Sequence, residues 1–415
     1  MKVGETRNAQ SAQWGKPLDG VRILAVEQMQ AMPYATQLMA HLGADVVKVE
    51  HPTRGESGRA AKPAMVDEDG REVGATFLRN NLGKRSIGLD LKAPEGRKLF
   101  ERLVPHFDVV AENFKAGTFE RLGLGYSVLS ELDPRVILLS VSGFGQDEAS
   151  PYRSWPSYAP IPEAMAGVYE QNRTGDDRPK PCIAGALGDT GSAMFAVIGT
   201  LAALRHREAT GLGQHVDISM YDAMVAMQDI GPMMWSMGVP ENPLLAGIGL
   251  FAGYRASDGH FVVHCIREPQ FAALSKLLGH PEWIDDPRFA ERQGWSTHNE
   301  DVIRPVLEKW ASTRTKLEAC HALADAGVAA GPSNTTKDNL ADPHVQARGM
   351  LIEVPRPDAP DPLLVVGNPV KLSRVAEGPI GRLPRLAEHT REVLEQTLDL
   401  PHSELDALAA RGVIG

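Results

Sequence analysis

Short apolar runs alternate with amphipathic stretches through the first 140 residues of the chain. The apolar runs predict five strands, and residues spaced three and four apart predict helices between them, for example over 34–42 and 95–104. Strands that alternate with helices are typical of a doubly wound parallel sheet, so we expect a Rossmann-like α/β fold. Ligands in such folds lie at the carboxyl ends of the strands. The predicted strands cover residues 21–26, 45–50, 86–91, 108–113 and 135–141.

The chain has 415 residues, enough for two domains that each bury a core of their own. Residues 1–16 are polar, and we expect a disordered leader there, without the apolar core of a secretory signal. The large Rossmann-like domain is predicted over residues 17–225. A linker and a smaller α+β domain follow over 226–325, where the apolar and Gly-rich character changes. Strand-like runs after 326 predict a C-terminal segment, 326–415, that returns to the large domain.

Charge and cysteine content exclude several classes of protein. The net charge of −10 argues against nucleic acid as a partner. The longest apolar run, residues 193–204, is too short to span a membrane. Three cysteines with no ligand spacing predict neither a disulfide framework nor a metal site, and a reducing, cytoplasmic setting is expected. Within the acidic chain, residues 79–98 carry six basic and two acidic residues, which favours a small anionic ligand.

Asp189 lies in a Gly-rich turn, residues 185–191, that leads into an apolar helix predicted over 192–206. The positive end of the helix dipole favours an ionised carboxylate at this place. An ionised carboxylate presented on a turn can act as a covalent nucleophile. Asp is also a preferred helix N-cap residue, so the segment alone favours a capping role over a catalytic one.

Several familiar sites are missing from the places where they would be expected. No Gly-x-Gly-x-x-Gly follows the first strand, which argues against a nicotinamide dinucleotide enzyme, and there is no Walker-type phosphate loop. No Gly-x-Ser-x-Gly supports a serine hydrolase. His260 and His264 share one face of a predicted strand, next to Cys265, but no third or fourth metal ligand accompanies them.

The order of the motifs nevertheless resembles one family, the family III coenzyme A transferases, which include formyl-CoA:oxalate CoA-transferase. The resemblance extends from about Pro17 to the end of the chain. It is carried by Pro-Leu-Asp-Gly-Val-Arg-Ile-Leu at 17–24, Leu-Gly-Ala-Asp-Val-Val-Lys-Val-Glu at 42–50, Asn-Leu-Gly-Lys-Arg-Ser-Ile-Gly-Leu-Asp-Leu at 81–91, Asp-Val-Val-Ala-Glu-Asn-Phe at 108–114, Ser-Gly-Phe-Gly at 142–145, Gly-Asp-Thr-Gly at 188–191 and Gly-Leu-Gly-Gln-His-Val-Asp-Ile-Ser at 211–219.

The resemblance implies a role for individual residues. Asp189 takes the place of the nucleophile and Gln30 that of an active-site glutamine, although Gln30 suits a cap of the following helix almost equally well. His51 stands where many relatives carry Arg, and Arg54 or Arg59 is expected to compensate. A substrate loop is expected at Gly247, Ile248 and Gly249. The implied CoA contacts are Gln30, Ala31, His51, Arg54, Asn81, Leu82, Gly83, Lys84, Arg85, Asn113, Phe114, Lys115, Arg121 and Tyr158.

The implied activity is transfer of CoA from an acyl-CoA, such as succinyl-CoA, to a carboxylic acid. Asp189 would form an aspartyl anhydride and then an aspartyl-CoA thioester. CoA is then a substrate, no cofactor is tightly bound, and an interlocked homodimer is expected. Intramolecular transfer within a dicarboxylic acyl-CoA stays open as an alternative. A 2-methylacyl-CoA racemase would need a second acid/base at Tyr158, a poor base near neutral pH. A silent subunit of a heteromeric transferase is disfavoured by the presence of Asp189 and Gln30.

Overall fold

The computed structural model describes residues 1–170, 177–181, 185–238 and 249–415. Two units form within it. The first combines Met1–Gln228 with His344–Gly415, and the second is Asp229–Pro343. The smaller unit therefore extends beyond the expected 226–325, and the C-terminal return to the first unit begins at His344 rather than at 326.

A six-stranded sheet forms the centre of the first unit, with the strand order β5-β2-β1-β6-β7-β8. Every neighbouring pair in it is parallel, which confirms the large parallel α/β sheet predicted from the alternation of strands and helices. β6 and β7 are buried throughout, as expected of strands covered on both faces. The strands are β1 (Arg22–Val26), β2 (Asp45–Glu50), β5 (Arg85–Gly88), β6 (Val109–Glu112), β7 (Ile137–Ser142) and β8 (His215–Ser219).

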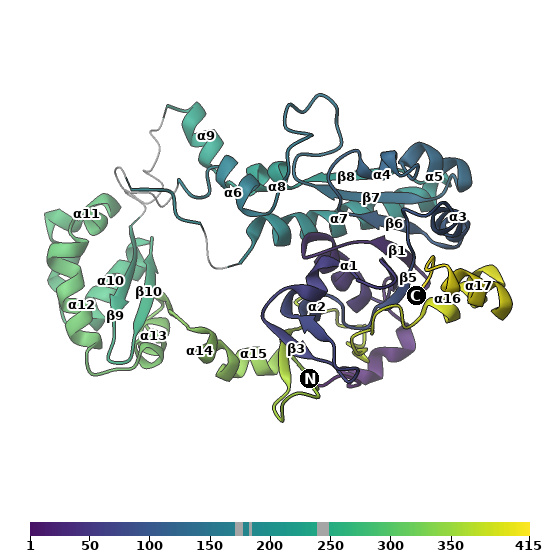
Figure 1. The fold of residues 1–415 in the computed structure, drawn as a ribbon. Coiled ribbons are helices and arrows are strands. Elements are labelled where there is room, and N and C mark those ends of the chain that lie inside the picture. Colours follow the sequence, from purple (N-terminus) through teal and green to yellow (C-terminus); the bar gives the residue numbers. More distant parts are fainter. Residues whose placement is uncertain (171–176, 182–184, 239–248) are drawn as a thin grey trace. The chain divides into compact units, whose positions relative to one another are not determined.

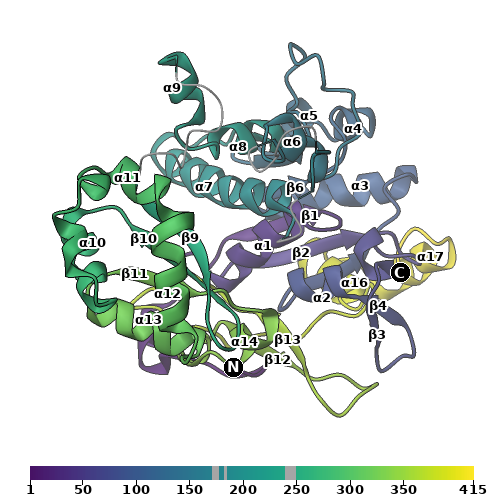
Figure 2. The same cartoon turned by 90° about the vertical axis from the view of Figure 1, so that its left-hand side faces the viewer.

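Helices cover both faces of this sheet (Figures 1 and 2). On one face α1 (Ala31–His41) and α7 (Leu187–Thr210) bury Met32, Met39 and Ala196 against the strands. The other face is covered by a second core, to which the C-terminal helices contribute Val393 and Leu405. The helices of that face are α3 (Pro94–Leu103), α5 (Tyr126–Leu132), α16 (Thr390–Leu398) and α17 (His402–Ala410).

The first unit also contains shorter elements around the sheet. Two antiparallel hairpins pair β3 with β4 and β12 with β13. Their bounds are β3 (Ala64–Val66), β4 (Glu72–Gly74), β12 (Leu351–Val354) and β13 (Leu363–Val366), and the remaining helices are α2 (Ala75–Asn80), α4 (Thr118–Arg121), α6 (Pro160–Met165) and α8 (Met220–Ala226), with α15 (Pro343–Ala347) starting at the unit boundary.

The expected disordered leader is instead ordered and packed. The N-terminal ammonium of Met1 donates to the carbonyl oxygen of Leu351 at 3.0 Å. The backbone of Arg7 forms an isolated antiparallel β-bridge with the backbone of Glu377. Met1 and Val3 pack on a small apolar cluster that includes Ile352. The polar composition of residues 1–16 does not predict this docking. Hydrogen bonds to the backbone of a distant segment hold these residues in place, beside the apolar contacts of Met1 and Val3.

α7 is longer than predicted. It spans 24 residues, where the sequence suggested a helix over 192–206 and an apolar stretch of only 193–204. By length and composition it could cross a membrane. In the structure its small residues Ala193, Ala196 and Ala203 lie in the core of the first unit, packed beside α1. Much of its apolar character is therefore accounted for by packing on the sheet.

The second unit has a three-stranded antiparallel sheet in the order β11-β10-β9. Its core includes Trp295 and Tyr254. His260 and His264 lie on the exposed face of β10, as the strand periodicity predicts. Its elements are α9 (Gly231–Ser236), β9 (Leu250–Arg255), β10 (His260–Cys265), α10 (Glu268–Leu277), α11 (Arg292–Thr297), α12 (Arg304–Ala311), α13 (Lys316–Asp325), β11 (Ala329–Pro332) and α14 (Thr336–Ala341).

Candidate active site

Two helices begin at the carboxyl edge of the parallel sheet. α1 connects β1 to β2 and α7 precedes β8, and because these strands are parallel, both helices run back from the carboxyl edge. Gln30 directly precedes α1, and Asp189 is the third residue of α7. The two helices pack against each other. The fold thus places both residues at the edge where ligands are expected.

Asp189 does not cap its helix. α7 begins at Leu187 with Ala186 at the N-cap position, so the helix starts earlier than the sequence suggested and Asp189 lies inside its first turn. Within the described part of the chain, no hydrogen bond or ion pair is formed by its carboxylate. Burial and the nearby Glu163 carboxylate raise the pKa of Asp189 to about 6, against the opposing effect of Arg79. The expected lowering by the helix dipole is therefore outweighed, although the carboxylate is still mostly ionised at neutral pH.

Gln30 is at the N-cap position of α1, but its side chain forms no capping hydrogen bond. Only its backbone carbonyl takes part, accepting from the amide of Tyr34 at 2.8 Å. The structure therefore does not show the side-chain cap by Gln30 that the sequence left open. Ala31, the neighbouring implied CoA contact, is buried in the core, so only its backbone could meet a ligand.

The loop before Gln30 is held by polar side chains. Asn113 clamps Gln28: its Oδ1 accepts from the Gln28 amide and its Nδ2 donates to the Gln28 carbonyl, both at 2.9 Å. Met29 has a left-handed φ of 61°, which costs a non-glycine residue about 1 kcal/mol. The buried Glu56 carboxylate accepts from the Met29 amide at 3.0 Å. Asn113, an implied CoA contact, therefore uses its side-chain amide to shape the loop.

Lys84 does not present its ammonium group to a ligand. Its side chain is fully buried, and Nζ lies 2.7 Å from Oε1 of Glu27. It also donates to the Thr36 hydroxyl and to the carbonyl of Pro33. Burial alone would raise the pKa of Glu27, but the ammonium groups of Lys84 and Lys48 outweigh burial and hold that pKa below its ordinary value. The implied CoA contact by Lys84 is replaced by an internal ion pair.

Arg85 and its neighbours also differ from the implied arrangement. Arg85 opens β5 and pairs with Asp45, the first residue of β2, so its guanidinium lies at the amino edge of the sheet. Leu82 is buried in an apolar cluster. Gly83 adopts a φ of 73° and donates its amide to Arg382, and Asn81 is fully buried, with Nδ2 bound to the Phe77 carbonyl.

The three basic residues after β2 separate into two groups. Arg59 is buried and bound to Glu50 through two contacts of 2.7 Å, so it is committed to an internal ion pair. Arg54 is exposed, and Nδ1 of His51 accepts weakly from the amides of Thr53 and Arg54, at 3.3 and 3.4 Å. Arg54, and not Arg59, is therefore the residue that could compensate for His51.

Two arginines converge on the left-handed Gly117. A β-carbon at this glycine would lie 3.1 Å from Nη1 of Arg121 and 3.4 Å from both Nη atoms of Arg153. Lys115 is exposed nearby in sequence, and Phe114 stacks on Phe119. Sequence reasoning identified Arg121 but missed Arg153, because the Pro-rich segment after it was judged to lack a basic residue. A guanidinium pair of this kind suits a phosphate.

Tyr158 and the predicted substrate loop are the remaining site residues implied by the resemblance. The Tyr158 side chain is exposed, and Ala159 beside it touches the first turn of α7: a β-carbon at Gly188 would lie 2.9 Å from the Ala159 carbonyl oxygen. Gly188 thus permits α6 to pack close to the turn that carries Asp189. Gly247 and Ile248 lie outside the described residues, and Gly249 precedes β9 with a φ of 108°.

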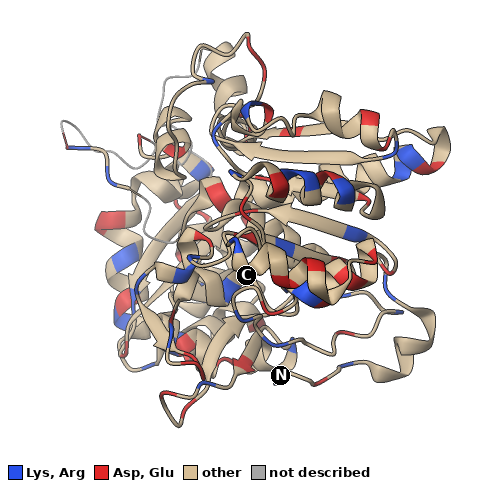
Figure 3. Ribbon diagram, turned by 45° about the vertical axis from the view of Figure 1, so that its right-hand side comes forward, with Lys and Arg blue, Asp and Glu red and all other residues tan. Residues whose placement is uncertain are grey.

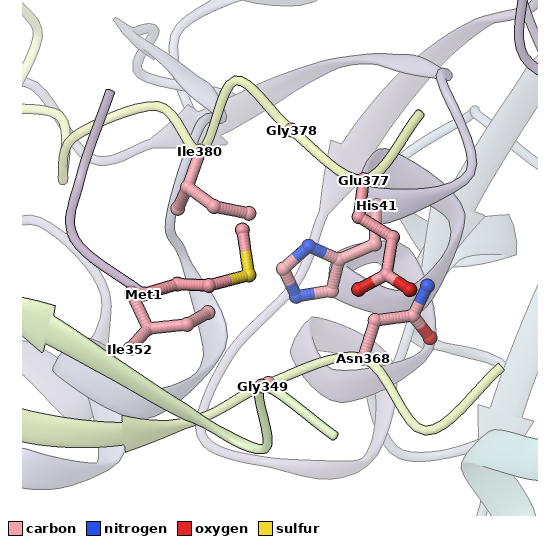
Figure 4. Close-up of a pocket in the computed structure, with 9 residues that line it drawn as sticks. Met1, His41, Gly349, Ile352, Asn368, Glu377, Gly378 and Ile380 are labelled. Carbon is pink, nitrogen blue, oxygen red and sulfur yellow. The ribbon is translucent and has the colours of Figure 1, made fainter. Parts of the chain in front are cut away.

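The basic stretch of residues 79–98 does not form one basic surface. Lys84 and Arg85 are paired with Glu27 and Asp45. Figure 3 shows Lys and Arg positions interspersed with Asp and Glu positions over the ribbon. A pocket elsewhere in the first unit contains His41, whose ring points between Met1 and Glu377 (Figure 4). Burial and nearby lysines lower the pKa of His41 to about 4, so its imidazole lines that pocket in the neutral form.

Comparison with known proteins identifies the family. The model of CoA-transferase family III matches residues 18–390. The chain belongs to this family. The family III CoA-transferase is 36% identical to the succinyl-CoA:mesaconate CoA-transferase of Haloarcula marismortui, covering 91% of this chain and 96% of that protein. It is 36% identical to the succinyl-CoA–D-citramalate CoA-transferase of Chloroflexus aurantiacus, covering 96% and 98%.

A solved structure gives the same result for the fold. The crystal structure of a CAIB/BAIF family protein from Brucella suis matches the CoA-transferase with a TM-score of 0.80 and 32% identity, covering 92% of this chain and 99% of that one. The resemblance predicted from the motifs is thereby confirmed. As a family III CoA-transferase, the protein uses CoA thioesters as substrates.

Proposed function

We propose that this CoA-transferase moves CoA from succinyl-CoA to a dicarboxylic acid, with Asp189 as the nucleophile. The observation that carries the proposal is the Asp189 carboxylate itself. It lies in the first turn of a helix at the carboxyl edge of the sheet, and no side chain described in the structure binds it. The pKa of about 6 leaves it mostly ionised at neutral pH yet more basic than an ordinary aspartate, which favours attack.

The proposed reaction has four balanced steps. The Asp189 carboxylate attacks the thioester carbonyl, the C–S bond breaks, and CoA leaves as a thiolate from an aspartyl–succinyl anhydride. The thiolate attacks the aspartyl carbonyl and releases succinate, which leaves an aspartyl-CoA thioester. The acceptor carboxylate then attacks this thioester and expels the thiolate. Finally the thiolate attacks the acceptor acyl carbon, and Asp189 is regenerated as a carboxylate.

The CoA site is proposed to use cations that have no acidic partner among the described residues. Arg121 and Arg153 converge on Gly117, and Arg54 lies exposed after β2, so these three residues suit the phosphates of CoA. Lys84, Arg85 and Arg59 are left out, because each is paired with a carboxylate inside the protein. The Gln30 side chain forms no capping hydrogen bond, so its amide group suits a hydrogen bond to an acyl oxygen.

The donor and acceptor are inferred from the relatives. Succinyl-CoA is named as the donor in both of the enzymes compared above, and their acceptors, mesaconate and citramalate, are both dicarboxylic acids. The same type of acceptor is proposed for this chain.

The interlocked homodimer expected from the resemblance is also proposed. Large apolar side chains are exposed on α7 and on α9, including Met194, Ile198, Met233 and Trp235. Exposed apolar clusters of this kind mark protein interfaces. Light scattering of the purified protein should give twice the chain mass of 44.9 kDa, and a monomer across the micromolar range would contradict the proposal.

Trapping the covalent intermediate tests the function. The protein is incubated with succinyl-CoA without acceptor, quenched in acid, digested and analysed by mass spectrometry. A CoA thioester is expected on the peptide that contains Asp189. Asp189→Asn should remove the adduct and lower transfer at least a thousandfold, as loss of a covalent nucleophile does.

Asp222 provides the matched control. It is the third residue of α8, as Asp189 is of α7, and it is exposed. Asp222→Asn should keep the adduct. An adduct that survives in Asp189→Asn, or none in the unaltered protein, would overturn the assignment of the nucleophile.

A further inference from the structure

The first turn of α7 receives its cap from another helix. Amides in the first turn of a helix have no partner within the helix, and a side-chain oxygen usually supplies one. In α8, Ser219 does this locally and accepts from the amide of Asp222 at 3.1 Å. α7 has Ala186 at the N-cap position, which cannot serve. Instead Oε1 of Glu163, from α6, accepts from the Gly188 amide at 2.9 Å.

Glu163 is held firmly in this position. It is 1% exposed, and its other oxygen accepts from the hydroxyl of Tyr169 at 2.5 Å. Gly188 lets α6 approach, because a β-carbon there would lie 2.9 Å from the carbonyl oxygen and 3.0 Å from Cα of Ala159. The carboxylate of Glu163 is thus fixed one residue away from Asp189 along the α7 backbone.

We propose that Glu163 is a positioning residue for the transfer reaction: its carboxylate caps α7 in place of Asp189, which leaves Asp189 free to attack, and it holds a second negative charge beside the first turn of α7. The inference rests on the proposed role of Asp189. An aspartate in the first turn of an uncapped helix would be drawn to the free amides, where its oxygens would be occupied. Glu163 removes that competition.

The charged groups that act on Asp189 are few. Within the described chain they are Glu163 from α6, which raises its pKa, and Arg79 from α2, which lowers it. Arg79 stacks on the ring of Tyr34 from α1, 4.7 Å from the ring centroid. The two groups act in opposite directions, so their removal should move Asp189 in opposite directions.

Glu163→Gln separates the charge from the hydrogen bonds. The amide oxygen can still accept from Gly188, and the amide group can still meet the Tyr169 hydroxyl. The titration of Asp189 is followed by carboxyl 13C NMR of protein labelled in Asp, with the resonance assigned by its loss in Asp189→Asn. The pH dependence of kcat/KM with succinyl-CoA is measured in parallel.

In the unaltered protein both midpoints should lie near 6. Glu163→Gln should move them down, toward the ordinary aspartate value of about 4. Relative to the plateau, activity at pH 5 should rise several-fold, while the plateau itself falls a few-fold because a less basic carboxylate attacks more slowly. Arg79→Gln should move the midpoint up. Glu208→Gln, at the far end of α7, should leave it unchanged.

A Glu163→Gln midpoint equal to that of the unaltered protein would overturn the proposal. So would a midpoint near 4 in the unaltered protein, a measurement that needs no Glu163 variant to fold. The NMR titration does not depend on turnover. A protein that forms no CoA adduct but shows the shift would therefore contradict the proposed nucleophile while leaving the effect of Glu163 on Asp189 established.

Discussion

Glu27 and Asp189 are carboxylates at the same edge of the same sheet, and their surroundings are opposite. Glu27 follows β1 with its side chain fully buried, between Lys84 Nζ at 2.7 Å and Lys48 Nζ at 3.4 Å. Asp189 is partly exposed, and no cation among the described residues forms an ion pair with it. Burial acts to raise the pKa of both, yet the pKa of Glu27 ends below its ordinary value and that of Asp189 rises to about 6.

The difference shows that neighbouring charges, and not burial alone, set the basicity of a carboxylate. The more deeply buried group is the less basic, because its neighbours neutralise it. Glu50 follows the same rule as Glu27, with Arg59 as its partner. At Asp189 the largest charged influence is another carboxylate, Glu163, and the smaller opposing influence of Arg79 does not offset it. Under the proposed role of Asp189, reactivity at this edge depends on the lack of a cationic partner among the described residues and not on depth.

Removal of the partner from Glu27 should have the largest effect. Lys84→Met leaves the buried Glu27 carboxylate with the longer ion pair to Lys48 and the hydrogen bond from the Thr36 hydroxyl. Breaking a buried pair from one side costs about 3–5 kcal/mol. Urea unfolding at pH 7 would measure the loss of free energy of unfolding. The difference in unfolding free energy between the variant and the unaltered protein should decrease at acid pH. Because the native pKa of Glu27 is lowered, its ionised form stabilises the folded state above the unfolded pKa, and this contribution is lost as pH falls through the native pKa.

Lys62→Met is the matched control. Lys62 pairs with Glu72 at 2.6 Å, but the two side chains are 65% and 62% exposed, so the loss should be under about 1 kcal/mol. Equal losses in the two variants would show that burial of the Glu27 pair does not matter to stability.

The fold could be predicted because its signal is local. The apolar runs that became β1, β2, β6 and β7 are short, β-branched and separated by amphipathic helices, and such a pattern has few solutions other than a parallel sheet. Docking of residues 1–16 could not be predicted in the same way. It depends on backbone bonds to residues near 351 and 377, which leave no periodic pattern in the leader.

For the site, sequence identified residue types but not their partners. Lys84 and Glu27 are separated by 57 positions, and nothing in either segment shows that they meet. The same limit applies to the start of α7. Its cap, Glu163, lies 25 residues upstream of Gly188 in the sequence. The local sequence around the turn therefore favours Asp189 as the capping residue instead. Arg153 was missed because only its proximity to Arg121 across a loop makes it a candidate phosphate contact.

Replacement of Asp189 should have a smaller effect on stability, and one of opposite sign. A carboxylate whose native pKa lies above its unfolded value binds protons more tightly when folded, so it lowers stability progressively as pH rises from about 4 to 6. Asp189→Asn removes this cost and the repulsion with Glu163. The variant should be inactive yet more stable at pH 7.5, on the order of 1–2 kcal/mol, since Asp189 is partly exposed and its field is screened.

The pH dependence distinguishes this cause from simple repacking. The stability difference between Asp189→Asn and the unaltered protein should be constant above about pH 7, decrease between pH 6 and pH 4, and reach its minimum below about pH 3, where both side chains are neutral. Urea unfolding at five or six pH values measures it. A difference independent of pH would assign the gain to packing, and a destabilised variant would mean that Asp189 is paired like Glu27, which would remove the contrast between the two carboxylates.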